Sequence, residues 1–102
     1  MASNTWVLIG NGSLLAGCGD ILLGSGHQIA AVVTSEPANE RWASGKGIRV
    51  EPSSSNLVEL LRGLTFDHLA SIAHLSVVPA EALRLVPGLA INFHEEIGRA
   101  HV

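Results

Sequence analysis

Apolar and polar positions alternate along this chain in blocks of two kinds. Short runs that are apolar on both faces, at residues 6–9 and 29–34, are typical of strands buried inside a parallel sheet. Between these runs, apolar residues recur every three or four positions over residues 14–24, which is the spacing of an amphipathic helix. Further strands are predicted at residues 48–50, 66–72 and 89–94.

Capping and turn residues separate these blocks. Ser13 and Asn56 stand at the N-cap positions of the first helix and of a helix predicted at about residues 56–63, and Pro79 begins a short helical turn. Residues 37–44 fit either a short helix or an irregular loop. Strands that alternate with helices predict right-handed βαβ units. We therefore expect a Rossmann-like α/β fold, an open parallel sheet of about five strands with helices on both faces, incomplete at its end.

Composition places the chain among globular proteins, as a single domain or part of one. Hydrophobic residues make up 47% and charged residues 15% of the 102 positions, which excludes a disordered chain. The apolar runs are far shorter than the ~20 residues of a membrane span, and a net charge of −3 without a basic cluster gives no footprint for nucleic acid. One cysteine, Cys18, and no targeting segment predict a cytoplasmic protein.

The end of the chain departs from the pattern. A parallel strand that ends at His94 calls for a crossover over the sheet, but only eight residues follow, without apolar periodicity. Residues 96–102 look like the conceptual translation of a common sequencing adapter. We therefore expect residues 1–94 to be a partial domain and residues 95–102 to be a non-native tail. A natural polar tail is the alternative.

The loop Gly10-Asn11-Gly12-Ser13 lies between the first predicted strand and the first predicted helix. Backbone N–H groups and the positive end of a helix dipole at such a place bind an anion or a polar ligand edge. The loop matches the dinucleotide fingerprint G-x-G-x-x-G/A only in part, because Leu15 occupies the third position. These four residues are therefore a candidate substrate-binding loop.

Asn92 and His94 are spaced i, i+2 in the last predicted strand, so their side chains leave one face at its carboxyl end and Phe93 leaves the other. That end of an open parallel sheet faces the ligand crevice. An amide and an imidazole supply an oxyanion donor and a proton-transfer group, as acyl-type transfer requires. A capping asparagine and a surface histidine fit the spacing equally well.

His74 follows the fourth predicted strand and is a further candidate for the rim of the same crevice. Neither H-x-x-x-H nor C-x-x-C occurs in the chain, so no metal is expected. Cys18 lies on the apolar face of the first predicted helix without an adjacent base or cation, which predicts a core residue.

A series of segments carries a resemblance to a known family; they are residues 7–15, 26–34, 47–50, 66–67, 76–79 and 90–94. Together they resemble the N-terminal domain of the folate-dependent formyltransferases, which include methionyl-tRNA formyltransferase and glycinamide ribonucleotide formyltransferase. The resemblance covers residues 5–94, and its most specific part is the Asn-x-His pair formed by Asn92 and His94. Residues 41–43 and 71–76 are most similar to the formyltransferase-like domains that open some large peptide synthetases.

The resemblance implies a transferase that moves a formyl group from 10-formyltetrahydrofolate to an amine. It also implies that Asn92 hydrogen-bonds the formyl oxygen and that His94, as an imidazolium, stabilises the tetrahedral intermediate. The aspartate and the loop that follow the histidine in that family are missing, and Glu95 and the predicted tail stand in their place. We therefore expect an inactive fragment, the first half of a catalytic domain within a larger multidomain synthetase.

The identity of the acceptor stays open among an aminoacyl-tRNA, an aminoacyl group on a carrier protein, a ribonucleotide and an amino sugar. This fragment is not expected to bind nucleic acid directly or to enter a membrane. One alternative is an enzyme like glycinamide ribonucleotide formyltransferase, although Leu14 stands where those enzymes have a polar asparagine. The other is a non-catalytic nucleotide- or dinucleotide-binding module that uses the Gly10-Asn11-Gly12 loop. Asn92 and His94 favour formyl transfer, and Leu15 disfavours the dinucleotide module.

Overall fold

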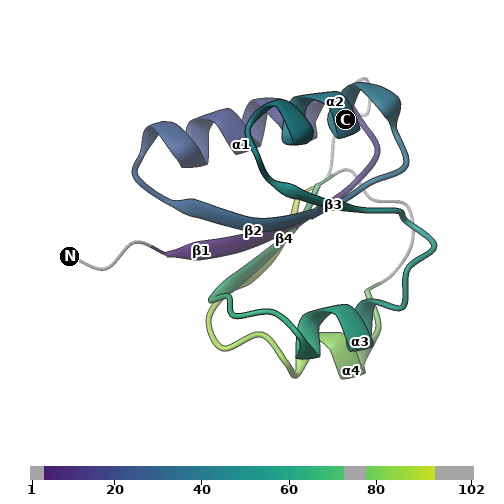
Figure 1. Ribbon diagram of the computed structural model, residues 1–102. Helices are drawn as coiled ribbons and strands as arrows, with labels where there is room; N and C mark the ends of the chain where they lie inside the picture. The colour runs from purple at the N-terminus through teal and green to yellow at the C-terminus, as the bar shows by residue number, and fades with distance from the viewer. Residues whose placement is uncertain (1–3, 73–77, 94–102) are drawn as a thin grey trace, which may run out of the picture.

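The computed structural model describes residues 4–72 and 78–93, which form an open sheet of parallel strands with helices on both sides (Figure 1). The strand order is β3-β2-β1-β4-β5, which reproduces five places of the doubly wound order 3-2-1-4-5-6. The strands are β1 Thr5–Ile9, β2 Gln28–Val33, β3 Arg49–Glu51, β4 His68–Ile72 and β5 Ala90–Phe93. The helices are α1 Leu14–Gly24, α2 Pro37–Gly45, α3 Leu57–Arg62 and α4 Ala80–Leu83. The predicted Rossmann-like α/β class is confirmed.

Two apolar clusters lie on opposite faces of the sheet. α1 and α2 cover one face, and α3 and α4 cover the other (Figure 1). Leu8 of β1 packs with Leu15 of α1, whereas its neighbours Val7 and Ile9 pack with Leu61 of α3. β1 is therefore apolar at successive positions because each face of the strand meets a different pair of helices. None of the helices in the described ranges is long and apolar enough to cross a membrane.

The segment after β2, which fitted helix and loop equally well, forms the helix α2. Pro37 stands at its start, where the missing N–H has no helical partner to lose, and Asn39 is buried within it. α2 lies so close to α1 that a Cβ on Gly19 would overlap the indole ring of Trp42. Trp42 Nε1 also donates a hydrogen bond to Asp20 Oδ1 at 2.9 Å. Packing and a hydrogen bond thus join the two helices.

The two predicted N-caps have different outcomes. Asn56 Oδ1 accepts a hydrogen bond from the backbone N–H of Glu59 at 3.2 Å, which confirms the cap of α3. Ser13 precedes α1, but its side chain makes no capping hydrogen bond. A capping side chain reaches the first turn from an extended backbone, whereas Ser13 is already helical at φ −68° and ψ −18°. The prediction that Ser13 caps α1 is wrong for this reason.

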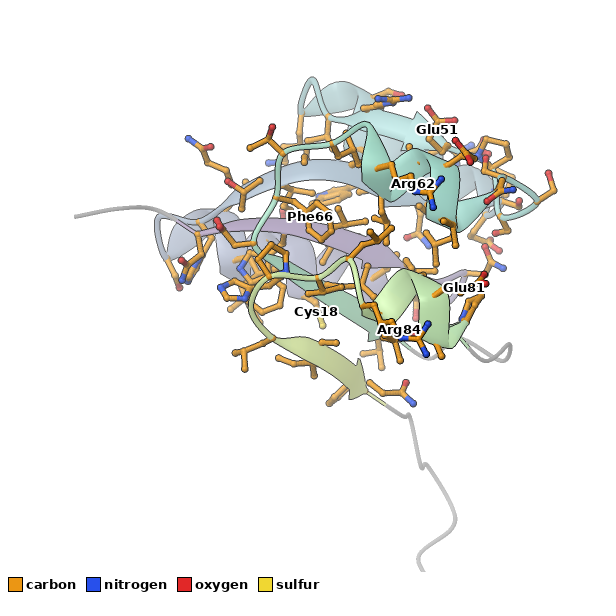
Figure 2. The ribbon with its side chains drawn as sticks, turned by 90° about the horizontal axis from the view of Figure 1, so that it is seen from below. Cys18, Glu51, Arg62, Phe66, Glu81 and Arg84 are labelled. Carbon is orange, nitrogen blue, oxygen red and sulfur yellow. The ribbon has the colours of Figure 1, made fainter. Side chains whose placement is uncertain are left out.

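β4 is shorter at its amino end than predicted, since it begins at His68 and not at Phe66. Phe66 turns into the apolar cluster on the α3 and α4 face, where Figure 2 shows its ring over the sheet. Asp67 Oδ2 accepts a hydrogen bond from the backbone N–H of Thr5 at 2.9 Å, which joins this segment to the start of β1.

Two histidines flank Trp6 at the amino edge of the sheet. Trp6 Nε1 donates to His27 Nδ1 at 3.3 Å, and the ring centroids of Trp6 and His68 lie 4.7 Å apart. His68 Nδ1 accepts a hydrogen bond from the backbone N–H of Leu89 at 2.8 Å, just before β5. Both imidazoles therefore lie at the end of the sheet opposite to the ligand crevice and join neighbouring segments there.

The two edges of the sheet differ in polarity. At β3 the side chains of Arg49 and Glu51 form an ion pair with an Nε–Oε2 distance of 2.7 Å. β5 carries no charge, and Leu89, Ile91 and Phe93 are 58%, 42% and 46% exposed. These three share one side of the strand by their two-residue spacing. An uncharged, apolar edge strand is open to association with another strand.

We expect the chain to self-associate through β5. Phe93→Lys should shift its sedimentation profile toward monomer, because a charge on an edge strand opposes strand pairing. Ile21→Lys is the matched control: Ile21 is 69% exposed but lies on α1, so this change should leave the profile as it was. A monomeric, cooperatively unfolding parent chain would contradict the expectation.

Candidate functional site at the carboxyl edge of the sheet

The strand order reverses at β1, because β2 and β3 lie on one side of it and β4 and β5 on the other. In open parallel sheets, ligands bind in the crevice outside the carboxyl ends of the strands at such a point. Gly10 follows β1 there and is buried, and a Cβ on it would overlap the carbonyl oxygen of Ile72 at the end of β4. Glycine is therefore required where the ends of β1 and β4 come together.

Asn11 ties together the loops that follow three strands. Its Oδ1 atom accepts hydrogen bonds from the backbone N–H of Ser35 at 2.7 Å, from Thr34 Oγ1 at 3.2 Å and from Ser53 Oγ at 3.2 Å. Thr34 and Ser35 follow β2, and Ser53 follows β3. The backbone N–H of Ser53 also donates to Ser35 Oγ at 3.0 Å. The Asn11 carboxamide oxygen is thus committed to holding the site together.

A second amide, that of Asn39, supports the loop from α2. Asn39 is 2% exposed, and its Nδ2 donates to the carbonyl oxygen of Gly12 at 3.0 Å and to Thr34 Oγ1 at 3.4 Å. Thr34 is fully buried and donates in turn to Asn11 Oδ1. Sequence reasoning missed Asn39 and Thr34. A polar residue on the inward side of a short helix was the available signal for Asn39.

The loop and the start of α1 leave backbone donors for a ligand. The N–H of Leu15 donates to the Gly12 carbonyl at 3.3 Å, whereas the N–H groups of Ser13 and Leu14 meet no backbone acceptor within the described ranges. Leu15 is fully buried, with Cδ1 3.5 Å from where a Cβ of Gly10 would stand. It fills the space that the third glycine of a dinucleotide loop leaves for close packing.

Asn92 lies at the same edge of the sheet, on β5 and two strands away from β1. With a strand spacing of about 4.8 Å, this separation is roughly 10 Å. Phe93 is in register with Ile72, which packs on the α1 and α2 face, so the exposed side chain of Asn92 leaves the α3 and α4 face. The predicted opposite orientation of Asn92 and Phe93 is confirmed. Asn92 and the Gly10–Ser13 loop therefore share an edge without sharing adjacent strands.

His74, His94 and the tail at residues 95–102 lie outside the described residues, so what was predicted for them stays a prediction. Over residues 4–72 and 78–93, no group of three or more His, Cys, Asp and Glu side chains is placed to hold a metal ion. The part of the candidate site that the structure defines is the loop cluster around Asn11, together with Asn92.

No protein-family model matches the chain, and no curated protein is significantly similar to it. The fold and the loop cluster define a Rossmann-like α/β protein with a polar site at the carboxyl edge of its sheet. The resemblance to the formyltransferases rests on the sequence segments given above and stays a prediction.

Cys18 lies on α1 and packs against the apolar cluster on that face of the sheet. Burial raises the pKa of its thiol, because an apolar environment disfavours the charged thiolate. The thiolate is the nucleophilic form, so Cys18 is a packing residue and a poor nucleophile at neutral pH.

Iodoacetamide at neutral pH should therefore alkylate Cys18 several-fold more slowly than it alkylates the thiol of a short unfolded peptide with the same neighbouring residues. The difference should shrink in denaturing urea and as the pH rises, because both changes increase the exposed thiolate. Mass spectrometry of quenched time points measures both rates. Equal rates in the folded chain and the peptide would show that Cys18 is not shielded.

The hydrogen bonds of Asn11 make a prediction about stability. Asn11→Ala should lower the free energy of unfolding by about 2 kcal/mol, because three donors lose their shared acceptor. Ser13→Ala is the control in the same loop and should change it by less than about 0.5 kcal/mol, since Ser13 makes no capping bond. Urea unfolding measures both variants, and equal losses would contradict the assignment.

Proposed function

We propose that this chain is the N-terminal part of a formyltransferase domain that moves a formyl group from 10-formyltetrahydrofolate to an amine. The observation that carries the proposal is Asn92 near the carboxyl end of β5, with His94 two residues later in the sequence. The parallel sheet supports it, because ligand crevices lie at this edge of such sheets. The resemblance of residues 5–94 supplies the class of reaction.

The chemistry needs a stabiliser for negative charge and a group that handles a proton. The acceptor amine attacks the formyl carbon, a new C–N bond forms, and the bond from that carbon to N10 of the folate breaks. The proton that the amine loses passes to N10. In this proposal, Asn92 Nδ2 donates a hydrogen bond to the oxygen on which charge develops, and the His94 imidazolium stabilises the same oxygen. Asn92 is exposed at this edge of the sheet.

The acceptor in this proposal is an aminoacyl-type amine, carried on a tRNA or on a carrier protein, or the amine of an amino sugar. The similarity of residues 41–43 and 71–76 to the domains that open peptide synthetases favours a place within a larger multidomain enzyme. A lone cysteine that packs as a free thiol is compatible with the cytoplasm, the compartment we propose.

A second candidate is a nucleotide-binding module, or an enzyme like glycinamide ribonucleotide formyltransferase, that binds a phosphate at the start of α1. The N–H groups of Ser13 and Leu14, which meet no backbone acceptor in the described part of the chain, favour it. Buried Leu15 argues against the dinucleotide form of this candidate.

The decisive experiment uses the chain continued past residue 94 by its own downstream coding sequence. That protein should transfer a formyl group from 10-formyltetrahydrofolate to an amine, and Asn92→Ala or His94→Ala should each lower kcat by about 100-fold or more. Folate binding should survive better than turnover, because these side chains act on charge that develops only in the transition state. Initial rates and equilibrium binding of 5-formyltetrahydrofolate, a stable isomer of the donor, measure the two effects.

His27→Ala is the control in the same protein. His27 bonds Trp6 at the opposite end of the sheet, so this change should lower stability and leave kcat nearly intact. The proposal would be overturned if the protein bound a nicotinamide dinucleotide tightly without needing Asn92 or His94, and transferred no formyl group to any amine tested. The dinucleotide-binding module would then be the better description.

A further inference from the structure

Asn11 is the only asparagine of the chain that is followed by a glycine. In such a pair, the backbone nitrogen of the second residue can attack the side-chain carbonyl carbon of the first, because glycine has no side chain that hinders the approach. The attack expels the side-chain amide as ammonia and modifies the chain without an enzyme. In a folded protein, the groups around the carboxamide oxygen, the attacking nitrogen and the leaving amide decide how fast this reaction runs.

The carboxamide oxygen of Asn11 lies among three hydrogen-bond donors. The backbone N–H of Ser35, which can only donate, is 2.7 Å away and identifies the atom as oxygen. Thr34 Oγ1, at 3.2 Å, already accepts hydrogen bonds from two N–H groups, so its own proton points to Asn11. Ser53 Oγ is the third donor, also at 3.2 Å. Negative charge that develops on this oxygen is therefore stabilised in the manner of an oxyanion hole.

The attacking nitrogen and the leaving amide carry no hydrogen bonds of their own. Within residues 4–72 and 78–93, neither the backbone N–H of Gly12 nor Nδ2 of Asn11 donates to an acceptor. Asn11 is exposed, so water and hydroxide reach the pair. The Gly12 nitrogen can therefore lose its proton, and the Asn11 amide can leave, without the loss of a hydrogen bond that either group makes in the described structure.

We infer that Asn11 is a site of spontaneous deamidation, and that the loops which donate hydrogen bonds to its oxygen promote the reaction. The Gly12 nitrogen gives its proton to hydroxide and forms a bond to Asn11 Cγ, and the bond from Cγ to Nδ2 breaks. Ammonia leaves with a proton taken from water, and a cyclic succinimide remains. Water then opens the ring to give aspartate, or isoaspartate with an extra methylene group in the main chain. Formyl transfer plays no part in this reaction.

Both products change the candidate substrate-binding loop. Each adds a negative charge to the loop that precedes α1, where the positive end of the helix dipole otherwise favours an anionic ligand. Isoaspartate also lengthens the backbone between Asn11 and Gly12, whose carbonyl oxygen accepts a hydrogen bond from the Asn39 amide at 3.0 Å. Deamidation therefore makes this loop less suited to bind an anion.

The first test follows deamidation of the folded chain at mildly alkaline pH, by mass spectrometry of the peptide that contains Asn11. Ser53→Ala removes one donor from the oxygen, and the rate should fall about fivefold, a factor that corresponds to one net hydrogen bond. Ser53→Thr keeps the hydroxyl and should react at the parent rate. Ser54→Ala removes an exposed neighbouring hydroxyl without a partner in the described ranges and should also react at the parent rate. The peptide that contains Asn56, which Leu57 follows, is the internal control and should stay unmodified over the same period.

The second test repeats the measurement in denaturing urea, which removes the donors and keeps the Asn-Gly sequence. The parent chain should deamidate at least about fivefold more slowly in urea than when folded, since its oxygen then lacks the donors of the folded loops. The parent and Ser53→Ala should react equally in urea. If Ser53→Ala does not fold, the comparison of the folded and unfolded parent chain decides alone. A folded Ser53→Ala variant that reacts as fast as the parent or faster would overturn the inference, and so would a folded parent that reacts no faster than in urea, because the hydrogen bonds would then restrain Asn11.

Discussion

Burial of β1 on both faces is the constraint on which the rest of the structure depends. β1 pairs with β2 on one side and with β4 on the other, and its residues Val7 and Leu8 are fully buried. Such a strand needs an apolar cover on each face, so the chain must place α1 and α2 on one side of the sheet and α3 and α4 on the other. The reversal of strand order, and with it the site, follows from the central place of β1.

Features that depend on short stretches of chain were predictable from the sequence. The doubly apolar runs of β1 and β2 and the periodicity of α1 are local, and Asn56 caps α3 through a contact within its first turn. The Ser13 cap failed because the backbone of Ser13 is already helical, in a loop that Thr34, Ser35 and Asn39 hold from far away in the sequence. Local preference does not contain that information.

In the candidate site, too, local features were predictable from the sequence and long-range contacts were not. The two-residue period was enough to place Asn92 and Phe93 on opposite faces. The partners of Asn11 come from the ends of β2 and β3, so its role depends on how those strands align with β1. The neighbours of Asn92 on the sheet are likewise set by the pairing of β4 with β5. The residue types were enough to predict the Gly10–Ser13 loop and Asn92 as parts of a site. Which residues lie next to them depends on the strand register.

The missing side chain at Gly19 has a mechanical consequence for the site. A Cβ there would meet the Trp42 indole, so any larger residue would push α2 away from α1. α2 also carries Asn39, which donates hydrogen bonds to the Gly12 carbonyl and to Thr34. Thr34 in turn donates to Asn11. A single added methyl group at Gly19, about 9 Å along α1 from the loop, would therefore displace α2 and disturb the hydrogen bonds that Asn39 makes to the loop.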